Sequence, residues 1–253
     1  MALAWIGAVI IGISLGLLGS GGSILTVPIL VYLVGQPEKV AIAGSLAIVG
    51  GIAFAGALPH AWRRHVHWRS VLFFGLPGML GTYLGAWLAL WIPGPVQLAV
   101  FAGVMLLAAF MMFRSPDLPA GEHQARATWK IVLDGLFVGV LTGLVGVGGG
   151  FLIVPALVLL GGLSVHHAVA TSLVVIAIKS FSGFYKYLDV LAKQDLNLDW
   201  QIIGIFTVLG ILGSWVGGYL APRISQKKLK KIFAGFLLVM GVAILGQTLS
   251  RMI

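Results

Sequence analysis

Eight long apolar stretches dominate this sequence and limit the folds open to it. A helix needs about 20 apolar residues to cross a hydrocarbon core about 30 Å thick, and short polar loops separate stretches of roughly that length or longer. Only 9% of the residues are charged, whereas soluble domains carry about 25%. We therefore expect an all-α membrane protein that crosses the bilayer several times. The stretches are Leu3–Val34, Val40–Leu58, Val71–Ile92, Val96–Phe113, Ile131–Gly161, Ala168–Tyr185, Ile202–Leu220 and Ile232–Leu249.

The first and fifth stretches carry the same glycine-rich motif, GLLGSGGSILTVP at Gly16–Pro28 and GLVGVGGGFLIVP at Gly143–Pro155. A constant shift of 127 residues aligns the two motifs and also the stretch that follows each of them. After a five-residue insertion in the second half, a shift of 132 residues aligns the remainder. The chain is thus predicted to hold two transmembrane repeats of about four apolar stretches, at 1–115 and 128–253, joined by a polar linker at 116–127.

Loop charges predict that the two repeats are inverted with respect to each other. The loop 60–69 holds three arginines and no acidic residue, which places it in the cytoplasm by the positive-inside rule. Its counterpart 186–199 lacks a cationic excess. The next pair of loops shows the reverse, because 93–95 is uncharged while 223–231 holds one arginine and four lysines. Equivalent loops on opposite sides of the membrane indicate inverted repeats.

Inversion requires an odd number of crossings in each half, because four crossings would leave the halves parallel. We therefore expect the first stretch of each half to break at its glycines into two shorter helices that form a re-entrant or hairpin element. Broken backbone at that depth is tolerated where it is buried in protein or lines a cavity, so the breaks are expected to meet near the midplane around a polar pathway. The alternative is that the glycines only allow close helix packing. Glycines elsewhere, such as Gly78, Gly81 and Gly85, suit such packing either within one protomer or in a homodimer.

The doubled motif, the two halves of four stretches and the chain length resemble the TauE/SafE sulfite exporter family, also called the TSUP family. The resemblance covers essentially the whole chain, and the paired motifs are its most specific part. It implies a transporter of sulfur-containing or carboxylate-type organic anions, such as sulfite, sulfoacetate or related sulfonates. The direction it implies is usually outward across a bacterial cytoplasmic (inner) membrane.

The motif residues give an independent reason to expect an anionic substrate. A helix that begins at Ser23 or Gly150 presents unpaired backbone N–H groups and the positive end of its dipole, and both attract anions. Hydroxyl groups in the first motif and in the stretches that follow add further donors. The residues predicted to bind the substrate are Ser20, Gly21, Gly22, Ser23, Ser45, Gly148, Gly149, Gly150, Thr171, Ser172 and Lys179.

Lys179 is the most informative of these residues. It lies well inside the stretch that begins at Ala168, where a lysine costs about 2.5–3.5 kcal/mol even on the lenient insertion scale. Its repeat partner is Ile52, so the repeat does not require a lysine there. We expect Lys179 to contact the anion. The alternative is that it reaches an interface or forms a structural pair with Asp134.

Other classes of function find less support in the sequence. There is no cysteine and no HExxH motif, and Asp134 is the only acidic residue within an apolar stretch, which argues against an enzyme. The histidines His60, His65 and His67 lie beside arginines, so we expect a solvated loop rather than a metal site. No cofactor and no nucleic-acid partner are expected. Two readings remain: a facilitator-like exporter whose halves rock around a midplane site, and a membrane scaffold or assembly factor that transports nothing.

Overall fold

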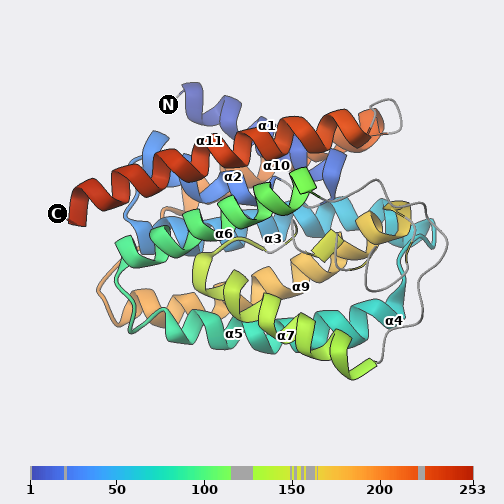
Figure 1. The fold of residues 1–253 in the computed structure, drawn as a ribbon, viewed down its shortest axis with the longest axis horizontal. Helices are drawn as coiled ribbons and strands as arrows, with labels where there is room; N and C mark the ends of the chain where they lie inside the picture. The colour runs from blue at the N-terminus through green and yellow to red at the C-terminus, as the bar shows by residue number, and fades with distance from the viewer. Residues whose placement is uncertain are drawn as a thin grey trace.

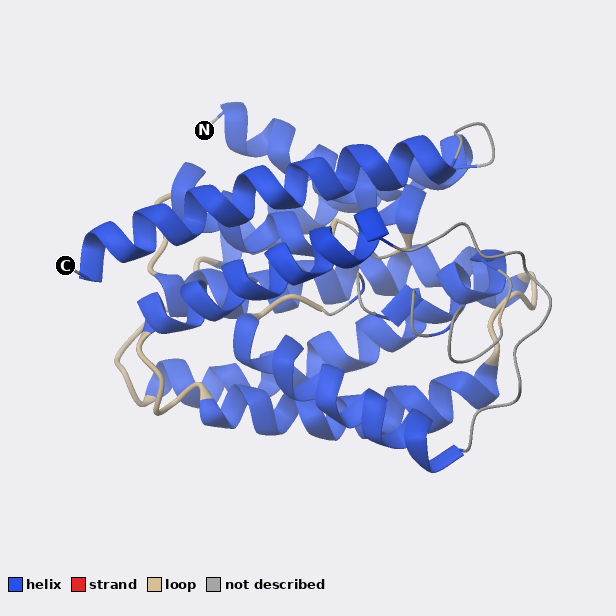
Figure 2. Cartoon of the chain, in the orientation of Figure 1, coloured by secondary structure: helices blue, strands red, loops and turns tan. Residues whose placement is uncertain are grey.

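The computed structural model describes residues 2–19, 22–114, 128–148, 150, 153–154, 157, 163, 165–221 and 226–252. All regular structure in these ranges is helical, and Figure 2 shows helices joined by short loops. The expected all-α fold is therefore confirmed for the described part of the chain. The predicted linker 116–127 lies outside the described residues.

The helices follow the apolar stretches, and the first helix on each stretch begins before the stretch does. Local capping fixes several starts: Pro37, with ψ at 146°, directly precedes Glu38, and the side chain of Asp199 accepts a hydrogen bond from the Ile202 N–H at 3.0 Å. The elements are α1 (Ala2–Leu18), α2 (Ser23–Pro28), the π-helix η1 (Ile29–Leu33), α3 (Glu38–Trp62), α4 (Trp68–Ser70), the π-helix η2 (Val71–Gly75), α5 (Leu76–Leu88), α6 (Gly94–Arg114), α7 (Thr128–Val145), α9 (Val165–Ala192), α10 (Trp200–Leu220) and α11 (Gln226–Met252).

Five of the described helical segments are long and apolar enough to cross a membrane. They are Glu38–Trp62, Trp68–Leu88, Gly94–Met111, His167–Ala192 and Trp200–Leu220. The segment Trp68–Leu88 is a continuous rod made of α4, η2 and α5. Large apolar side chains such as Phe137 and Leu80 stand 66% and 60% exposed on the outside of the molecule, where lipid would cover them. The protein is thus a multi-pass membrane protein.

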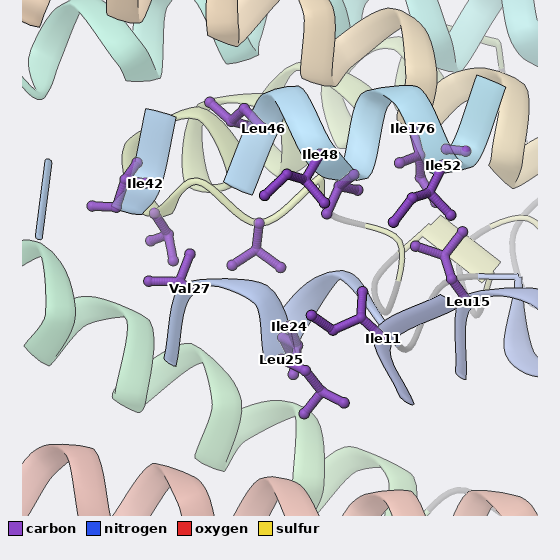
Figure 3. Packing of buried hydrophobic residues seen from close by; sticks show 14 of the residues in the cluster. Ile11, Leu15, Ile24, Leu25, Val27, Ile42, Leu46, Ile48, Ile52 and Ile176 are labelled. Carbon is purple, nitrogen blue, oxygen red and sulfur yellow. The ribbon is translucent and has the colours of Figure 1, made fainter. Parts of the chain in front are cut away.

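The first apolar stretch breaks at its glycines, as the sequence predicted. Helix α1 ends at Leu18, Gly19 adopts φ +65°, and α2 begins at Ser23. The second arm then folds back along the first, because Gly22 lies against Leu15 and Ile29 lies against Gly7. Figure 3 shows apolar side chains of this hairpin and of α3 meeting in the core. In the second half α7 ends at Val145, before Gly146 at φ +74°, and most of the segment that follows lies outside the described residues.

Helices of the two halves pair reciprocally. Helix α1 packs on α10, and its repeat counterpart α7 packs on α5, the counterpart of α10. The remaining equivalent helices pack on each other, α3 on α9 and α6 on α11 (Figure 1). Helices α3 and α9 are antiparallel, since Leu46 lies against Gly183 while Gly56 lies against Leu173. An inverted repeat requires equivalent helices to be antiparallel in this way. The orientation of the two halves in a bilayer stays a prediction.

Two glycine-lined contacts hold α1 to α10 and α5 to α7. A Cβ atom on Gly16 would overlap the Ser214 carbonyl oxygen, and one on Gly217 would overlap that of Ile13. The α5–α7 contact repeats this pattern, with Gly85 facing the Val140 carbonyl and Gly143 facing that of Thr82. Small residues allow helix backbones to approach this closely in a membrane. These glycines therefore allow close helix packing within one chain. The packing does not bear on a homodimer, which stays a prediction.

Candidate functional site

The centre of the molecule is the crossing of α3 and α9. A Cβ atom on Gly50 would lie 3.3 Å from the Ser180 Cβ, and both residues are near the middle of their long helices. The two helices are repeat counterparts, and Gly148 in the second glycine motif lies against Val49 and its repeat partner Ile176. The two halves therefore meet at this crossing, with one predicted site residue, Gly148, directly beside it.

Lys179, the residue before Ser180 in α9, is fully buried, with 0% of its surface exposed, and its side chain packs on η2 and α5. Its Nζ atom is 5.8 Å from the centroid of the Phe74 ring, and its Cδ would lie 3.0 Å from a Cβ on Gly78. Among the described residues, Asp134 included, no group forms a hydrogen bond with this Nζ. The cation–π contact offsets only part of the cost of burying an ammonium group. The structural ion pair with Asp134, one of the two alternatives for Lys179, is not formed.

Ser180 is a second buried polar side chain at the crossing. Its Oγ would lie 2.9 Å from a Cβ on Gly148 and has no hydrogen-bond partner among the described residues. Successive residues of a helix point about 100° apart, so the two side chains have different neighbours. Lys179 lies against Phe74 and Gly78, whereas Ser180 lies against Gly148 and Gly50. At adjacent positions α9 thus carries an ammonium group and a hydroxyl group, neither of which has a hydrogen-bond partner in the described part of the chain.

The crossing is asymmetric in charge although its backbone is repeated. Ile52, the repeat partner of Lys179, packs against Gly210 as Lys179 packs against Gly78, and Gly210 is the repeat partner of Gly78. Ser180 has Ala53 as its repeat partner. The first half thus offers apolar side chains in the places where the second half offers Lys179 and Ser180.

Ser45 and Ser172 hold the two glycine breaks in place. The Ser45 hydroxyl donates a hydrogen bond to the Gly146 carbonyl oxygen at 2.8 Å. Its repeat partner Ser172 shares its proton between the carbonyl oxygen of Gly19 at 2.9 Å and that of Val169, in its own helix, at 2.8 Å. Each serine therefore fixes the positive-φ glycine of the opposite half. Because each proton is already donated, binding of an anion by either hydroxyl would require one of these bonds to break.

We expect loss of either hydroxyl to destabilise the fold by a similar amount. Ser45→Ala or Ser172→Ala leaves a buried carbonyl oxygen without its donor, which costs about 0.6–1.7 kcal/mol in membrane proteins. Thermal unfolding of the purified protein in detergent measures this loss. The control is Ser182→Ala, which removes a half-buried hydroxyl bonded to the Met79 carbonyl, away from both breaks. A double Ser45→Ala and Ser172→Ala variant as stable as the parent would contradict this role.

The other predicted site residues lie at several places. Thr171 accepts a hydrogen bond from the His67 backbone N–H at 3.0 Å, near the start of α9. Gly22 and Ser23 are buried where the returning arm of the hairpin begins, and Gly150 is buried within the second motif. The remaining predicted residues, Ser20, Gly21 and Gly149, lie outside the described residues. The convergence of two helix N-termini on one ligand therefore stays a prediction.

The structure also joins polar residues that lie far apart in the sequence. The Gln97 side-chain amide donates to the Leu144 carbonyl and to the Tyr187 hydroxyl, both at 3.1 Å, and Tyr187 also donates to Leu144. The His65 ring lies 5.9 Å from that of His167 and 6.2 Å from that of His60, by centroids. No group of three potential ligands that suits a metal ion occurs in the described part of the chain.

The chain matches the family model described as Sulfite exporter TauE/SafE over residues 4–244. It is 38% identical over 242 residues to a probable membrane transporter protein of Xylella fastidiosa, covering 93% of this chain and 90% of the relative. A probable membrane transporter protein of Methanocaldococcus jannaschii is 28% identical, with 94% of each chain covered. The YdhB protein of Bacillus subtilis, also a probable membrane transporter protein, is 26% identical over 91% of this chain and 96% of its own. This chain belongs to the TauE/SafE sulfite exporter family.

Proposed function

We propose that this protein is a membrane transporter that exports small organic or sulfur-containing anions, such as sulfite, sulfoacetate or related sulfonates. The observation that carries the proposal is Lys179, a fully buried ammonium group with no hydrogen-bond partner among the described residues. Ionisable residues inside membrane segments are costly and usually functional. The family and the names of the relatives support a transporter over an enzyme.

The anion binds at the α3–α9 crossing, near the midplane of the bilayer. Lys179 provides the charge and a charge-assisted hydrogen bond, and the neighbouring Ser180 provides a hydroxyl donor. In the absence of substrate the ammonium group lies over the Phe74 ring. It leaves the ring when an anion offers a stronger interaction. Ser45, Ser172 and Thr171 act by fixing the backbone on which the site is built.

Transport exposes the crossing to one side of the membrane and then to the other. Lys179 and Ser180 are both 0% exposed, which supports a resting state in which neither side of the membrane reaches the proposed site. The glycine contacts bind α1 to α10 and α7 to α5. Each of these pairs joins a helix of one half to a helix of the other half, and we call them the exchanged helix pairs. The moving bodies are these exchanged helix pairs rather than the two halves of the sequence. They move against each other around the α3–α9 crossing. The membrane potential favours export of a monovalent anion by about 2.3 kcal/mol per 100 mV.

Flux measured in proteoliposomes tests this function. Purified protein should carry sulfite, or a sulfonate such as methanesulfonate, with saturable kinetics, and glucose should not compete. Flux should continue without a pH gradient and should respond to an imposed potential. Absence of flux for every anion in folded protein would overturn the proposal and favour the membrane scaffold instead. A bacterial inner membrane is the expected location, and protein found only in another membrane would contradict it.

A further inference from the structure

We infer that Gln97 and Tyr187 form the outer gate of the export route, at the end of a polar track that begins at Lys179. The inference rests on the proposed function and names the path by which the anion leaves its site. The track lies where α9 packs on the exchanged helix pair of α5 and α7. The hydroxyl groups along it belong to Thr82, Thr142 and Ser182.

The inner part of the track follows the contact between α9 and α5. The Lys179 Cε would lie 3.1 Å from a Cβ on Gly78. Ser182, three positions later in α9, donates a hydrogen bond to a backbone carbonyl oxygen of α5 at 3.1 Å. Gly183 comes next and lies against the Thr82 side chain. Polar groups therefore continue from Lys179 toward the C-terminal ends of both helices.

Helix α7 adds a further hydroxyl group to the track. The Oγ1 atoms of Thr142 and Thr82 are 3.4 Å apart, and both residues are buried. Each hydroxyl donates to a carbonyl oxygen of its own helix, at 2.9 Å and 2.8 Å. Because a hydroxyl proton rotates to suit its partners, both groups can turn toward a passing anion.

The track ends at the last turn of α7, where two side chains bind one carbonyl oxygen. The Leu144 carbonyl oxygen accepts hydrogen bonds from the Gln97 amide at 3.1 Å and from the Tyr187 hydroxyl at 3.2 Å. Tyr187 is eight residues after Lys179, which is about 12 Å along α9. These bonds join α6 and α9 to α7, so they close the end of the track until they break.

The gate also has the chemistry to receive an anion when it opens. The Gln97 amide and the Tyr187 hydroxyl both point a donor at one oxygen, as donors do around an anion. The Gln97 Oε1 atom is buried and has no hydrogen-bond partner among the described residues. A buried polar atom left in this way costs free energy, so stability alone does not account for the cluster.

The other half of the chain lacks most of these polar groups. Of the four polar residues at the track and gate whose repeat partners the two shifts assign, only Thr82 has a partner with a hydroxyl group, Ser214. The other three partners are apolar: Ala55 is that of Ser182, Leu15 that of Thr142 and Leu229 that of Gln97. Helix α1 packs on α10 as α7 packs on α5, so close packing of the helices does not require the polar groups.

The direction of the track agrees with export. It leads to the end of α9 that precedes the loop 186–199, which the loop charges predict to lie outside the cytoplasm. In the proposed transport cycle the exchanged helix pair of α5 and α7 moves relative to α9. This movement takes the Leu144 carbonyl away from Tyr187 and opens the track to the outside.

A single introduced thiol tests the track, because the chain has no cysteine. Thr82→Cys places the thiol in the track, and Ser214→Cys places it at the repeat position, which is also buried. The probe is 2-sulfonatoethyl methanethiosulfonate, a membrane-impermeant reagent that itself carries a sulfonate, added to right-side-out membrane vesicles. We expect Thr82→Cys to react at least about tenfold faster than Ser214→Cys. If Thr82→Cys does not fold, Ser182→Cys replaces it.

Tyr187→Phe tests the gate in the Thr82→Cys background. It keeps the ring and removes one hydrogen bond to Leu144, so the reaction with the probe should become about three- to tenfold faster. The matched control is Tyr185→Phe, which removes a hydroxyl from a side chain that is 69% exposed on the same helix and should change nothing. An unchanged rate in Tyr187→Phe would mean that the cluster only caps α7, and would overturn the gate.

The remaining outcomes separate this inference from the proposed function. Equal reaction rates of Thr82→Cys and Ser214→Cys, or reaction of Thr82→Cys only in inside-out vesicles, would overturn the outward track. Methanesulfonate flux through the parent protein would then leave the proposed function intact. Absence of that flux in folded parent protein would count against the proposed function itself.

Discussion

Lys179→Met is expected to lower anion flux at least about tenfold, since a hydrogen bond to a charged group contributes about 1.5–3 kcal/mol. The methionine keeps an unbranched side chain out to the Cε position, which packs against Gly78, so the loss reports the missing ammonium group. The same variant should unfold at a higher temperature than the parent, because it removes a buried cation that has no hydrogen-bond partner in the described structure. Flux and thermal unfolding of one preparation measure both effects.

The combination of lower flux and higher stability separates a binding role from a structural one. A lysine needed only for folding would lower stability when replaced. Lys186→Met is the matched control, because Lys186 is also buried in α9 but pairs with Asp189. It should leave flux almost unchanged. Unaltered flux in Lys179→Met would rule out the proposed site at the α3–α9 crossing.

Gly217→Leu is expected to prevent folding, while Gly218→Leu at the next position is tolerated. A Cβ on Gly217 would overlap the Ile13 carbonyl oxygen, whereas one on Gly218 has no neighbour within 4 Å. Even small overpacking costs about 1–3 kcal/mol, and a leucine would separate α1 from α10 altogether. Exchanging an exposed helical glycine for a better helix former gains up to about 1 kcal/mol.

Yield of monodisperse protein and its unfolding temperature compare these two variants. Gly85→Leu should fail in the same way, because Gly85 is the repeat partner of Gly217 and faces the Val140 carbonyl. Normal stability of Gly217→Leu would mean that α1 and α10 do not pack closely, and the arrangement of the exchanged helix pairs would then be wrong.

Much of the fold could be predicted because its causes are local. Long apolar runs give membrane helices, and an apolar run with four glycines in seven residues at Gly16–Gly22 cannot remain one regular helix. The break between Leu18 and Ser23 follows from these rules alone. Helix ends were less predictable: α9 runs from Val165 to Ala192, beyond the apolar stretch, because polar residues such as Lys186 and Asp189 pair along its last turns.

The partners of each helix could not be predicted, because they depend on the other half of the chain. Nothing near Ser45 indicates that its hydroxyl reaches Gly146, and nothing near His65 indicates His167. Lys179 was identified from its energetic cost in an apolar stretch, which is a local property. Ser180 is not among the predicted binding residues, and a serine in a membrane helix usually satisfies itself on its own backbone. Its lack of a partner among the described residues is visible only in three dimensions.

The exchanged helix pairs have a consequence for how the protein is made. Helix α1 leaves the ribosome well before α10, on which it packs, has been synthesised. Until then the glycine face of α1 has lipid or the insertion machinery as its neighbour, and the same holds for α5 before α7 appears. The first four apolar segments thus enter the bilayer as an unfinished assembly, and final packing is a step that follows translation. A chain that ends before Trp200 would be inserted but not folded.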